Sequence, residues 1–141
     1  MVRVASVKGS KLPVPKAKQK KTKMRKQEPE EANRNVNMET ATSDQSLITI
    51  LDDIKSSKLP AVINYGASWC GVCSQTFPAF QELSSSFKRI KFVYADIDEC
   101  PETTLRIRYT PTFQFYRDGE KVDEMFGAGE ERLHDRLWLL S

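Results

Sequence analysis

Two cysteines, Cys70 and Cys73, stand between a short apolar run and an amphipathic pattern, and this arrangement constrains the fold more than any other feature of the chain. The apolar run, residues 61–65, follows a proline and is typical of a buried β-strand. Large hydrophobic residues then recur at helical spacing between Phe77 and Phe87. The pair is therefore predicted at the junction of a strand and a helix, where unpaired N–H groups and the helix dipole stabilise a thiolate.

The rest of the hydrophobic pattern predicts strands that alternate with helices and end in a hairpin. A capping box at Thr42 and Gln45 precedes an amphipathic helix that is predicted to end near Ser57. The further predicted elements, in chain order, are a strand over Lys91–Asp98, a short helix after Pro101, strands over Thr112–Tyr116 and Lys121–Phe126 joined by a turn at Asp118–Gly119, and a helix over Glu130–Leu140.

Charge is distributed unevenly along the 141 residues. The first 27 residues hold ten Lys or Arg and no acid, whereas the remainder holds twelve basic and nineteen acidic residues, so that +10 and −7 sum to the net charge of +3. Residues 1–41 contain no aromatic side chain and are predicted to form a disordered basic tail, followed by one domain over residues 42–141. Because aromatic residues do not interleave with the Lys-rich run 16–26, nucleic acid is not an expected partner.

The expected location is the cytoplasm. No apolar run approaches the roughly 18 residues that span a bilayer, and no apolar segment follows the early positive charges as in a secretory signal. An odd number of cysteines, three, favours a reducing compartment over a disulfide framework. We therefore expect no membrane partner, and the basic tail leaves the nucleus or a plastid as alternatives.

The C-x-x-C motif by itself leaves three interpretations open, which are thiol exchange, half of a zinc site, and two ordinary buried cysteines. In thiol exchange, Cys70 attacks a target disulfide and Cys73, three residues on and on the same helix face, resolves the mixed disulfide. In a zinc site, the pair would supply half of about four ligands. The other soft ligands, Cys100 and His134, are not paired at metal-like spacing, so that no metal and no cofactor are predicted. Cys100 is interpreted as a loop thiol whose pKa is raised by the acids of residues 96–99.

Several independent motifs resemble the thioredoxin family over residues 42–140. Trp69–Cys73 reads Trp-Cys-Gly-Val-Cys and resembles the family's Trp-Cys-Gly-Pro-Cys, and Pro78 matches a proline in the helix that follows. Tyr109–Phe113 is similar to the loop that carries the family's cis-proline, and Asp118–Gly119 and Gly127 match further family positions. Residues 61–73 and 94–101 look most like the plant thioredoxin-like 3-3 proteins.

The resemblance implies a thioredoxin fold of the α/β class, with a central mixed β-sheet flanked by helices. It also implies a thiol–disulfide oxidoreductase that acts on disulfide-containing proteins and receives electrons from a donor such as thioredoxin reductase or glutathione. Cys70 would be the exposed nucleophile and Cys73 the buried resolving thiol. The substrate would contact a surface around this dithiol, formed by Trp69, Gly71, Val72, Thr110 and Pro111, with the peptide bond before Pro111 in cis.

Three positions depart from the family pattern. Val72 replaces the proline between the cysteines, Asn64 stands where other members carry a buried Asp, and Tyr94 stands where they often have a Lys paired with it. Because an amide cannot titrate, resolution by Cys73 is expected to be slower or to use water.

The alternative function is a non-catalytic adaptor that binds partners through the surface of Trp69 and Pro111. Asn64 and Val72 favour the adaptor, whereas retention of both cysteines favours the oxidoreductase.

Overall fold

The computed structural model describes residues 38–141, so that the predicted basic tail, apart from its last four residues, lies outside the described residues. Within them, the order is strand, helix, strand, helix, three strands and a helix. The elements are β2 (Met38–Ala41), α3 (Asp44–Ser57), β3 (Ala61–Gly66), α4 (Gly71–Ser86), β4 (Lys91–Asp96), β5 (Thr112–Arg117), β6 (Glu120–Phe126) and α5 (Glu130–Leu140).

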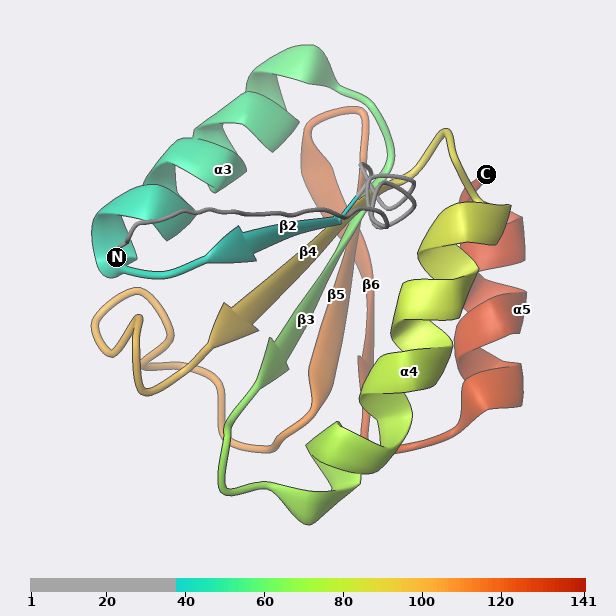
Figure 1. Cartoon of the computed structure of the whole chain (residues 1–141). Coiled ribbons are helices and arrows are strands. Elements are labelled where there is room, and N and C mark those ends of the chain that lie inside the picture. The colour runs from blue at the N-terminus through green and yellow to red at the C-terminus, as the bar shows by residue number, and fades with distance from the viewer. Residues whose placement is uncertain (1–37) are drawn as a thin grey trace, which may run out of the picture. The chain divides into compact units, whose positions relative to one another are not determined.

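The strands form one five-stranded sheet in the order β2-β4-β3-β5-β6 (Figure 1). The central strand β3 pairs in parallel with β4 and antiparallel with β5. At one edge β2 pairs in parallel with β4, and at the other edge β6 pairs antiparallel with β5. The mixed sheet implied by the resemblance is therefore present.

Helices cover both faces of the sheet, with α3 on one face and α4 and α5 on the other (Figure 1). Successive residues of a strand point to opposite faces, so β3, which is buried along its whole length, supplies both cores. Ile63 and Tyr65 pack in the core under α3, whereas Val62 packs in the core under α4 and α5. The helices contribute Leu47, Ile50 and Ile54 to the first core and Phe80, Leu83, Leu133, Leu137 and Leu140 to the second.

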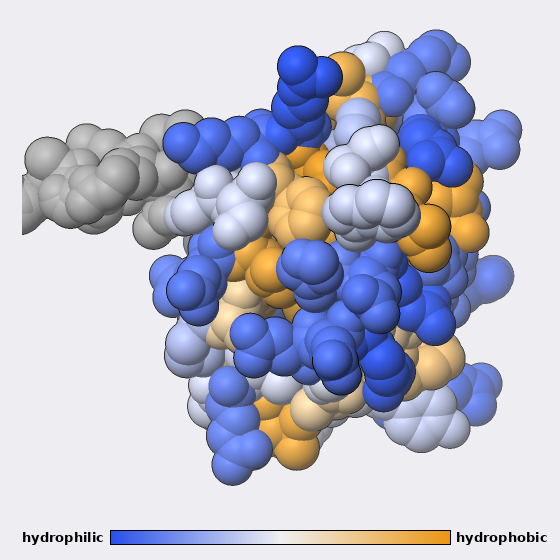
Figure 2. Space-filling view, turned by 90° about the vertical axis from the view of Figure 1, so that its right-hand side faces the viewer, coloured by the Kyte–Doolittle hydropathy of each residue, from blue (hydrophilic) through white to orange (hydrophobic). Residues whose placement is uncertain are grey.

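The side of the molecule that carries α4 and α5 presents hydrophilic residues interrupted by hydrophobic patches (Figure 2). Two large hydrophobic residues of α5, Trp138 and Leu139, are exposed to solvent. None of the helices within residues 38–141 combines the length and the apolar character needed to cross a membrane.

The start of α3 differs by one residue from the predicted capping box. The hydroxyl of Ser43 accepts a hydrogen bond from the N–H of Ser46 at 3.1 Å, and the hydroxyl of Ser46 accepts one from the N–H of Ser43 at 3.0 Å. The predicted pair of Thr42 and Gln45 is wrong, because two adjacent hydroxyl residues both suit the cap and a serine can take the reciprocal role of Glu or Gln. The predicted end of the helix at Ser57 is confirmed.

The strand β2 was not predicted, and it lies in the segment assigned to the tail. Its residues Met38–Ala41 pair with Phe92–Ala95 of β4, and Glu39 forms an ion pair of 2.7 Å with Lys91. Four residues are too few to show a period of their own, and they form a strand because the edge of β4 supplies hydrogen-bond partners. The described fold therefore includes residues before the boundary predicted at residue 42.

The short helix predicted after Pro101 is also wrong, since this segment forms a series of turns. The N–H groups of Glu102 and Thr103 donate to the carboxylate of Asp44 in the first turn of α3, at 3.1 and 2.8 Å. The hydrogen bonds from the Thr103 side chain and backbone are the main reason that the pKa of Asp44 is lowered. These hydrogen bonds attach the turns after Pro101 to the start of α3.

The predicted hairpin turn at Asp118–Gly119 is confirmed between β5 and β6. Both residues have positive φ, 57° for Asp118 and 85° for Gly119, as in the type I′ turn that Asp-Gly favours. A Cβ at Gly119 would also lie 2.9 Å from the carbonyl oxygen of Lys55, so that both backbone and space require glycine. The final helix has the predicted bounds Glu130–Leu140.

Candidate active site

The loop between β3 and α4 carries the cysteine pair, and the first cysteine caps the helix. Cys70 is the N-cap of α4, and its sulfur accepts a hydrogen bond of 3.1 Å from the N–H of Cys73. The first N–H groups of a helix have no partner within it, and a side-chain acceptor at the N-cap satisfies one of them. The predicted strand-to-helix junction is confirmed, and Cys70 occupies the end of the helix that favours negative charge.

The pKa of the Cys70 thiol is lowered from its ordinary value. Desolvation by burial is the strongest single influence and acts against this shift. Hydrogen bonds from the side chains of Cys73 and Thr110, with those from the backbone N–H groups of Cys73 and Val72, together outweigh it. Because the thiolate is the nucleophilic form, the site favours reaction at Cys70 over reaction at an ordinary cysteine.

The pKa of Cys73 moves in the opposite direction. Burial raises it to about 11, and the hydrogen bond to Cys70 acts in the same sense because it is made while Cys73 keeps its proton. The side chains differ little in exposure, 8% for Cys70 and 4% for Cys73. The expectation of an exposed Cys70 is therefore wrong, because Ala67 and Thr110 lie against its sulfur.

The loop before β5 brings Thr110 and Pro111 to the dithiol. The peptide bond between them is cis, as the resemblance implied, and the carbonyl oxygen of Thr110 lies 3.5 Å from the sulfur of Cys70. The carbonyl of Pro111 accepts a hydrogen bond of 2.8 Å from the N–H of Gly127, which holds this loop to the segment after β6. The fold thus brings Thr110 to the sulfur of Cys70, which lies 40 positions earlier in the sequence.

Three further predicted contact residues surround Cys70. Trp69 is 67% exposed, and its indole N–H donates to the carboxylate of Asp98 at 2.7 Å, so that the ring lies at the surface and not in the core. Val72 is also exposed, and a Cβ added at Gly71 would meet no atom within 4 Å. The backbone at Gly71 is therefore open to an approaching partner.

An aromatic pair beside this surface was missed by the sequence analysis. The rings of Tyr109 and Phe126 meet edge to face with their centroids 5.5 Å apart, and both side chains are at least half exposed. Each residue directly precedes a position that the sequence did single out, Thr110 or Gly127. Their places in the chain were a usable signal, but only the fold, in which the N–H of Gly127 donates to the carbonyl of Pro111, brings the two rings together.

The two polar positions that depart from the family pattern lie behind the dithiol. Asn64 and Tyr94 are opposite each other in the pairing of β3 with β4. Asn64 is 1% exposed, and neither its Oδ1 nor its Nδ2 has a hydrogen-bond partner among the described residues. Tyr94 extends over the end of β3 and contacts Phe77 of α4 edge to face, with ring centroids 5.3 Å apart.

The third cysteine does not belong to this site. Cys100 is fully buried in the core under α3, and its thiol donates to the carbonyl oxygen of Ser43 at 3.3 Å. Its pKa is raised, first by burial and then by the charges of Asp44, Glu99 and Asp96, so the acidic neighbours predicted from sequence have the smaller effect. Cys100 does lie in a loop and its pKa is raised, as predicted, but burial and not charge is the main cause. Within residues 38–141, no three Cys, His, Asp or Glu side chains are grouped to hold a metal ion.

Comparisons with known proteins agree with the geometry. The family model described as Thioredoxin matches residues 41–137. Thioredoxin-like 3-3 of Arabidopsis thaliana is 81% identical over 105 residues, which cover 74% of this chain and 83% of that protein. Thioredoxin-like 3-3 of Oryza sativa subsp. japonica is 71% identical over 105 residues, covering 74% and 81%.

A solved structure shows the same arrangement of elements. The crystal structure of thioredoxin O2 from Arabidopsis thaliana in the oxidized state superposes with a TM-score of 0.68 at 28% sequence identity. The match covers 74% of this chain and 94% of that one.

Proposed function

Because the chain belongs to the thioredoxin family, whose members are disulfide oxidoreductases, we propose that it reduces or exchanges disulfides in other proteins through Cys70 and Cys73. The observation that carries the proposal is that the pKa values of Cys70 and Cys73 are shifted in opposite directions. That of Cys70 is lowered at the N-terminus of α4, and that of Cys73 is raised to about 11. Cys70 is thereby favoured as the attacking thiolate, whereas Cys73 remains a thiol until the second step.

The reaction proceeds in two exchanges. The thiolate of Cys70 attacks one sulfur of the target disulfide, and the other target sulfur leaves with the bonding electron pair and takes a proton. Cys73 then loses its proton and attacks the sulfur of Cys70, which expels the second target thiolate. Two electrons have passed to the target, and the protein holds a Cys70–Cys73 disulfide that a donor must reduce.

The surface around Cys70 supports binding of an extended polypeptide. The Thr110 carbonyl lies beside the nucleophile, and the open backbone at Gly71 leaves room for a partner chain. Exposed Trp69 and Val72 add apolar area that a protein substrate buries on docking. Pro111 follows Thr110 at this surface, and we propose that Trp69, Gly71, Val72, Thr110 and Pro111 bind the substrate.

Reduction of insulin by dithiothreitol, followed by turbidity, tests the proposal. The wild-type protein should accelerate the reaction, and Cys70→Ser should abolish the acceleration. Cys100→Ala is the matched control, because it removes a buried cysteine outside the dithiol and should retain activity in protein that remains folded. A folded wild-type protein without activity would overturn the proposal and favour the adaptor, in which Cys70→Ser retains partner binding.

The electron donor is proposed at the level of its chemical class. A disulfide between Cys70 and Cys73 accepts electrons from another dithiol or from a small thiol by the same exchange run in reverse. Insulin reduction driven by NADPH with thioredoxin reductase, compared with NADPH, glutathione and glutathione reductase, distinguishes the two donors. A donor that leaves the Cys70–Cys73 disulfide oxidised is excluded.

A further inference from the structure

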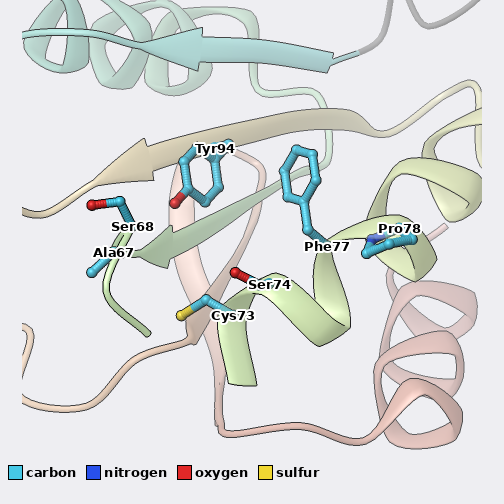
Figure 3. A pocket seen from close by; sticks show the side chains of 7 residues that line it. All are labelled: Ala67, Ser68, Cys73, Ser74, Phe77, Pro78 and Tyr94. Carbon is cyan, nitrogen blue, oxygen red and sulfur yellow. The ribbon is translucent and has the colours of Figure 1, made fainter. Parts of the chain in front are cut away.

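A cavity opens behind the dithiol, on the side of the resolving cysteine. It has a volume of about 370 Å³ and is open to solvent. Its lining includes the thiol of Cys73, the hydroxyls of Ser68 and Ser74 and the ring of Tyr94, as Figure 3 shows. The rest of the lining, Ala67, Phe77 and Pro78, is apolar, but the space is open to solvent and large enough for several water molecules, each of which occupies roughly 30 Å³ in the liquid. Cys73 is therefore buried from the substrate side but has a path to water at its rear.

Tyr94 is held in this cavity by packing on two sides. Its ring contacts Phe77 at 5.3 Å, and a Cβ at Gly66 would lie only 2.9 Å from its Cε1 and its hydroxyl oxygen. The hydroxyl is therefore fixed above the last residue of β3. In Figure 3 it points away from Phe77, toward the end of the cavity where Ala67 and Cys73 lie.

The resolving step needs a group that handles the proton of Cys73. Asn64 faces the same side of the sheet as Val62, but an amide has no titratable proton and its polar atoms make no hydrogen bond among the described residues. A tyrosine hydroxyl both donates and accepts hydrogen bonds. It is thus able to stabilise a developing thiolate through water without becoming charged.

We propose that Tyr94 is a positioning residue for the resolving step, whose hydroxyl orders cavity water against the sulfur of Cys73. The inference rests on the proposed oxidoreductase function. As Cys73 attacks, its proton passes to cavity water and then to solvent, its electron pair forms the bond to the sulfur of Cys70, and the target sulfur leaves with the pair of the broken bond.

The charges around Tyr94 favour the uncharged form of its hydroxyl. Its pKa is raised to about 12, first by burial and then by the charges of Asp96, Cys73, Cys70 and Glu99. The hydroxyl therefore keeps its proton through the physiological range and acts as a hydrogen-bond donor. Negative charges on the cysteines and on Tyr94 would repel each other. Tyr94 therefore stays neutral when Cys73 becomes a thiolate.

Reaction with the disulfide reagent DTNB separates the two steps. Attack by Cys70 releases one coloured thiolate, and attack by Cys73 on the resulting adduct releases a second, which Cys73→Ser should lack. We expect Tyr94→Phe to slow the second release by about tenfold, as for a rise of about one unit in the pKa of Cys73, and to move its pH midpoint upward. The first release and the melting temperature should stay unchanged.

Tyr65→Phe is the matched control, because Tyr65 is a buried tyrosine of β3 on the other face of the sheet. It should leave both releases unchanged. An unaffected second release in Tyr94→Phe, or equal slowing of both releases, would overturn the inference. A wild-type protein that gives no second release would overturn the proposed function as well, so the two failures are distinguishable.

Discussion

The backbone N–H of Cys73 donates a hydrogen bond to the sulfur of Cys70 across 3.1 Å, so the ionisation of the two cysteines is linked. Donors at the start of α4 stabilise the thiolate of Cys70, and the thiol of Cys73 adds another donor while it keeps its proton. A second thiolate so close would be opposed by the first. The geometry therefore favours one thiolate and one thiol, which is the division of roles that two-step exchange requires.

Alkylation should distinguish the cysteines. At neutral pH a short iodoacetamide pulse should label Cys70 first, since its pKa is lowered, whereas labelling of Cys73 should rise only as the pH approaches about 11. Mass spectrometry of the peptides after pulses at several pH values measures both, with buried Cys100 as an internal reference. Preferential labelling of Cys73 would contradict the assigned roles.

Removal of the resolving thiol should trap substrates. In Cys73→Ser, the mixed disulfide on Cys70 has no internal nucleophile and should persist. Adducts formed in a cell extract and released by dithiothreitol are detected on non-reducing gels, and Cys70→Ser/Cys73→Ser is the matched control. If the single variant forms no thiol-reversible adducts, the adaptor gains support over the oxidoreductase.

Asn64→Asp should accelerate the resolving step. A carboxylate at this buried position has a raised pKa and is able to take the proton of Cys73, whereas the amide is not. Attack by Cys70 should change little, because its activation comes from the start of α4. Stopped-flow measurement of the second DTNB release tests this, and an unchanged or slower release in folded Asn64→Asp would show that a carboxylate there is no better proton acceptor than the cavity water.

The same substitution should cost stability. Asn64 already lies in the core without a hydrogen-bond partner among the described residues, and an acid in its place is harder to desolvate. We expect Asn64→Asp to lower the free energy of unfolding by about 1–3 kcal/mol. Urea denaturation at pH 5 and pH 8 measures it, with the larger loss at pH 8, where more of the carboxyl is ionised. An equal loss at both pH values would mean that the new group does not titrate between them.

Gly66→Ala should destabilise the fold through Tyr94. The added Cβ would lie 2.9 Å from the tyrosine ring, and relief of this overlap requires the ring or the strand to shift, at a cost of about 1–3 kcal/mol. Gly71→Ala is the control, since its Cβ meets no atom within 4 Å. Thermal denaturation compares them, and the cost should shrink in a Tyr94→Ala background. Equal melting temperatures for the two single variants would contradict the position of Tyr94.

Local patterns were sufficient for much of the fold and for the centre of the site. Cys70 and Cys73 were placed at a strand-to-helix junction because an apolar run and a helical pattern flank them in the sequence, and the structure has that junction. Asp118–Gly119 and the helix Glu130–Leu140 were predicted correctly for the same reason. In each case the signal lies in neighbouring residues, where backbone preference and periodicity act.

Only the tertiary structure decided the features that depend on distant residues. Met38–Ala41 is a strand because β4 pairs with it, and the turns after Pro101 are attached to α3 by the carboxylate of Asp44, far away in the sequence. Cys70 is nearly buried because Thr110, 40 positions later, lies against it. Hydrogen bonds and burial of this kind are properties of chains already brought together, so no local pattern contains them.

The difference between what the sequence determined and what the fold decided is clearest behind the dithiol. From the sequence alone, Asn64 and Tyr94 were two departures from a family pattern, and the amide indicated only that a proton acceptor was missing. The fold placed Tyr94 over Gly66 and opened a cavity that it shares with Cys73. The residue types determined which chemistry each side chain is able to perform, and the packing of β3, β4 and α4 decided which side chains share a space in which to perform it.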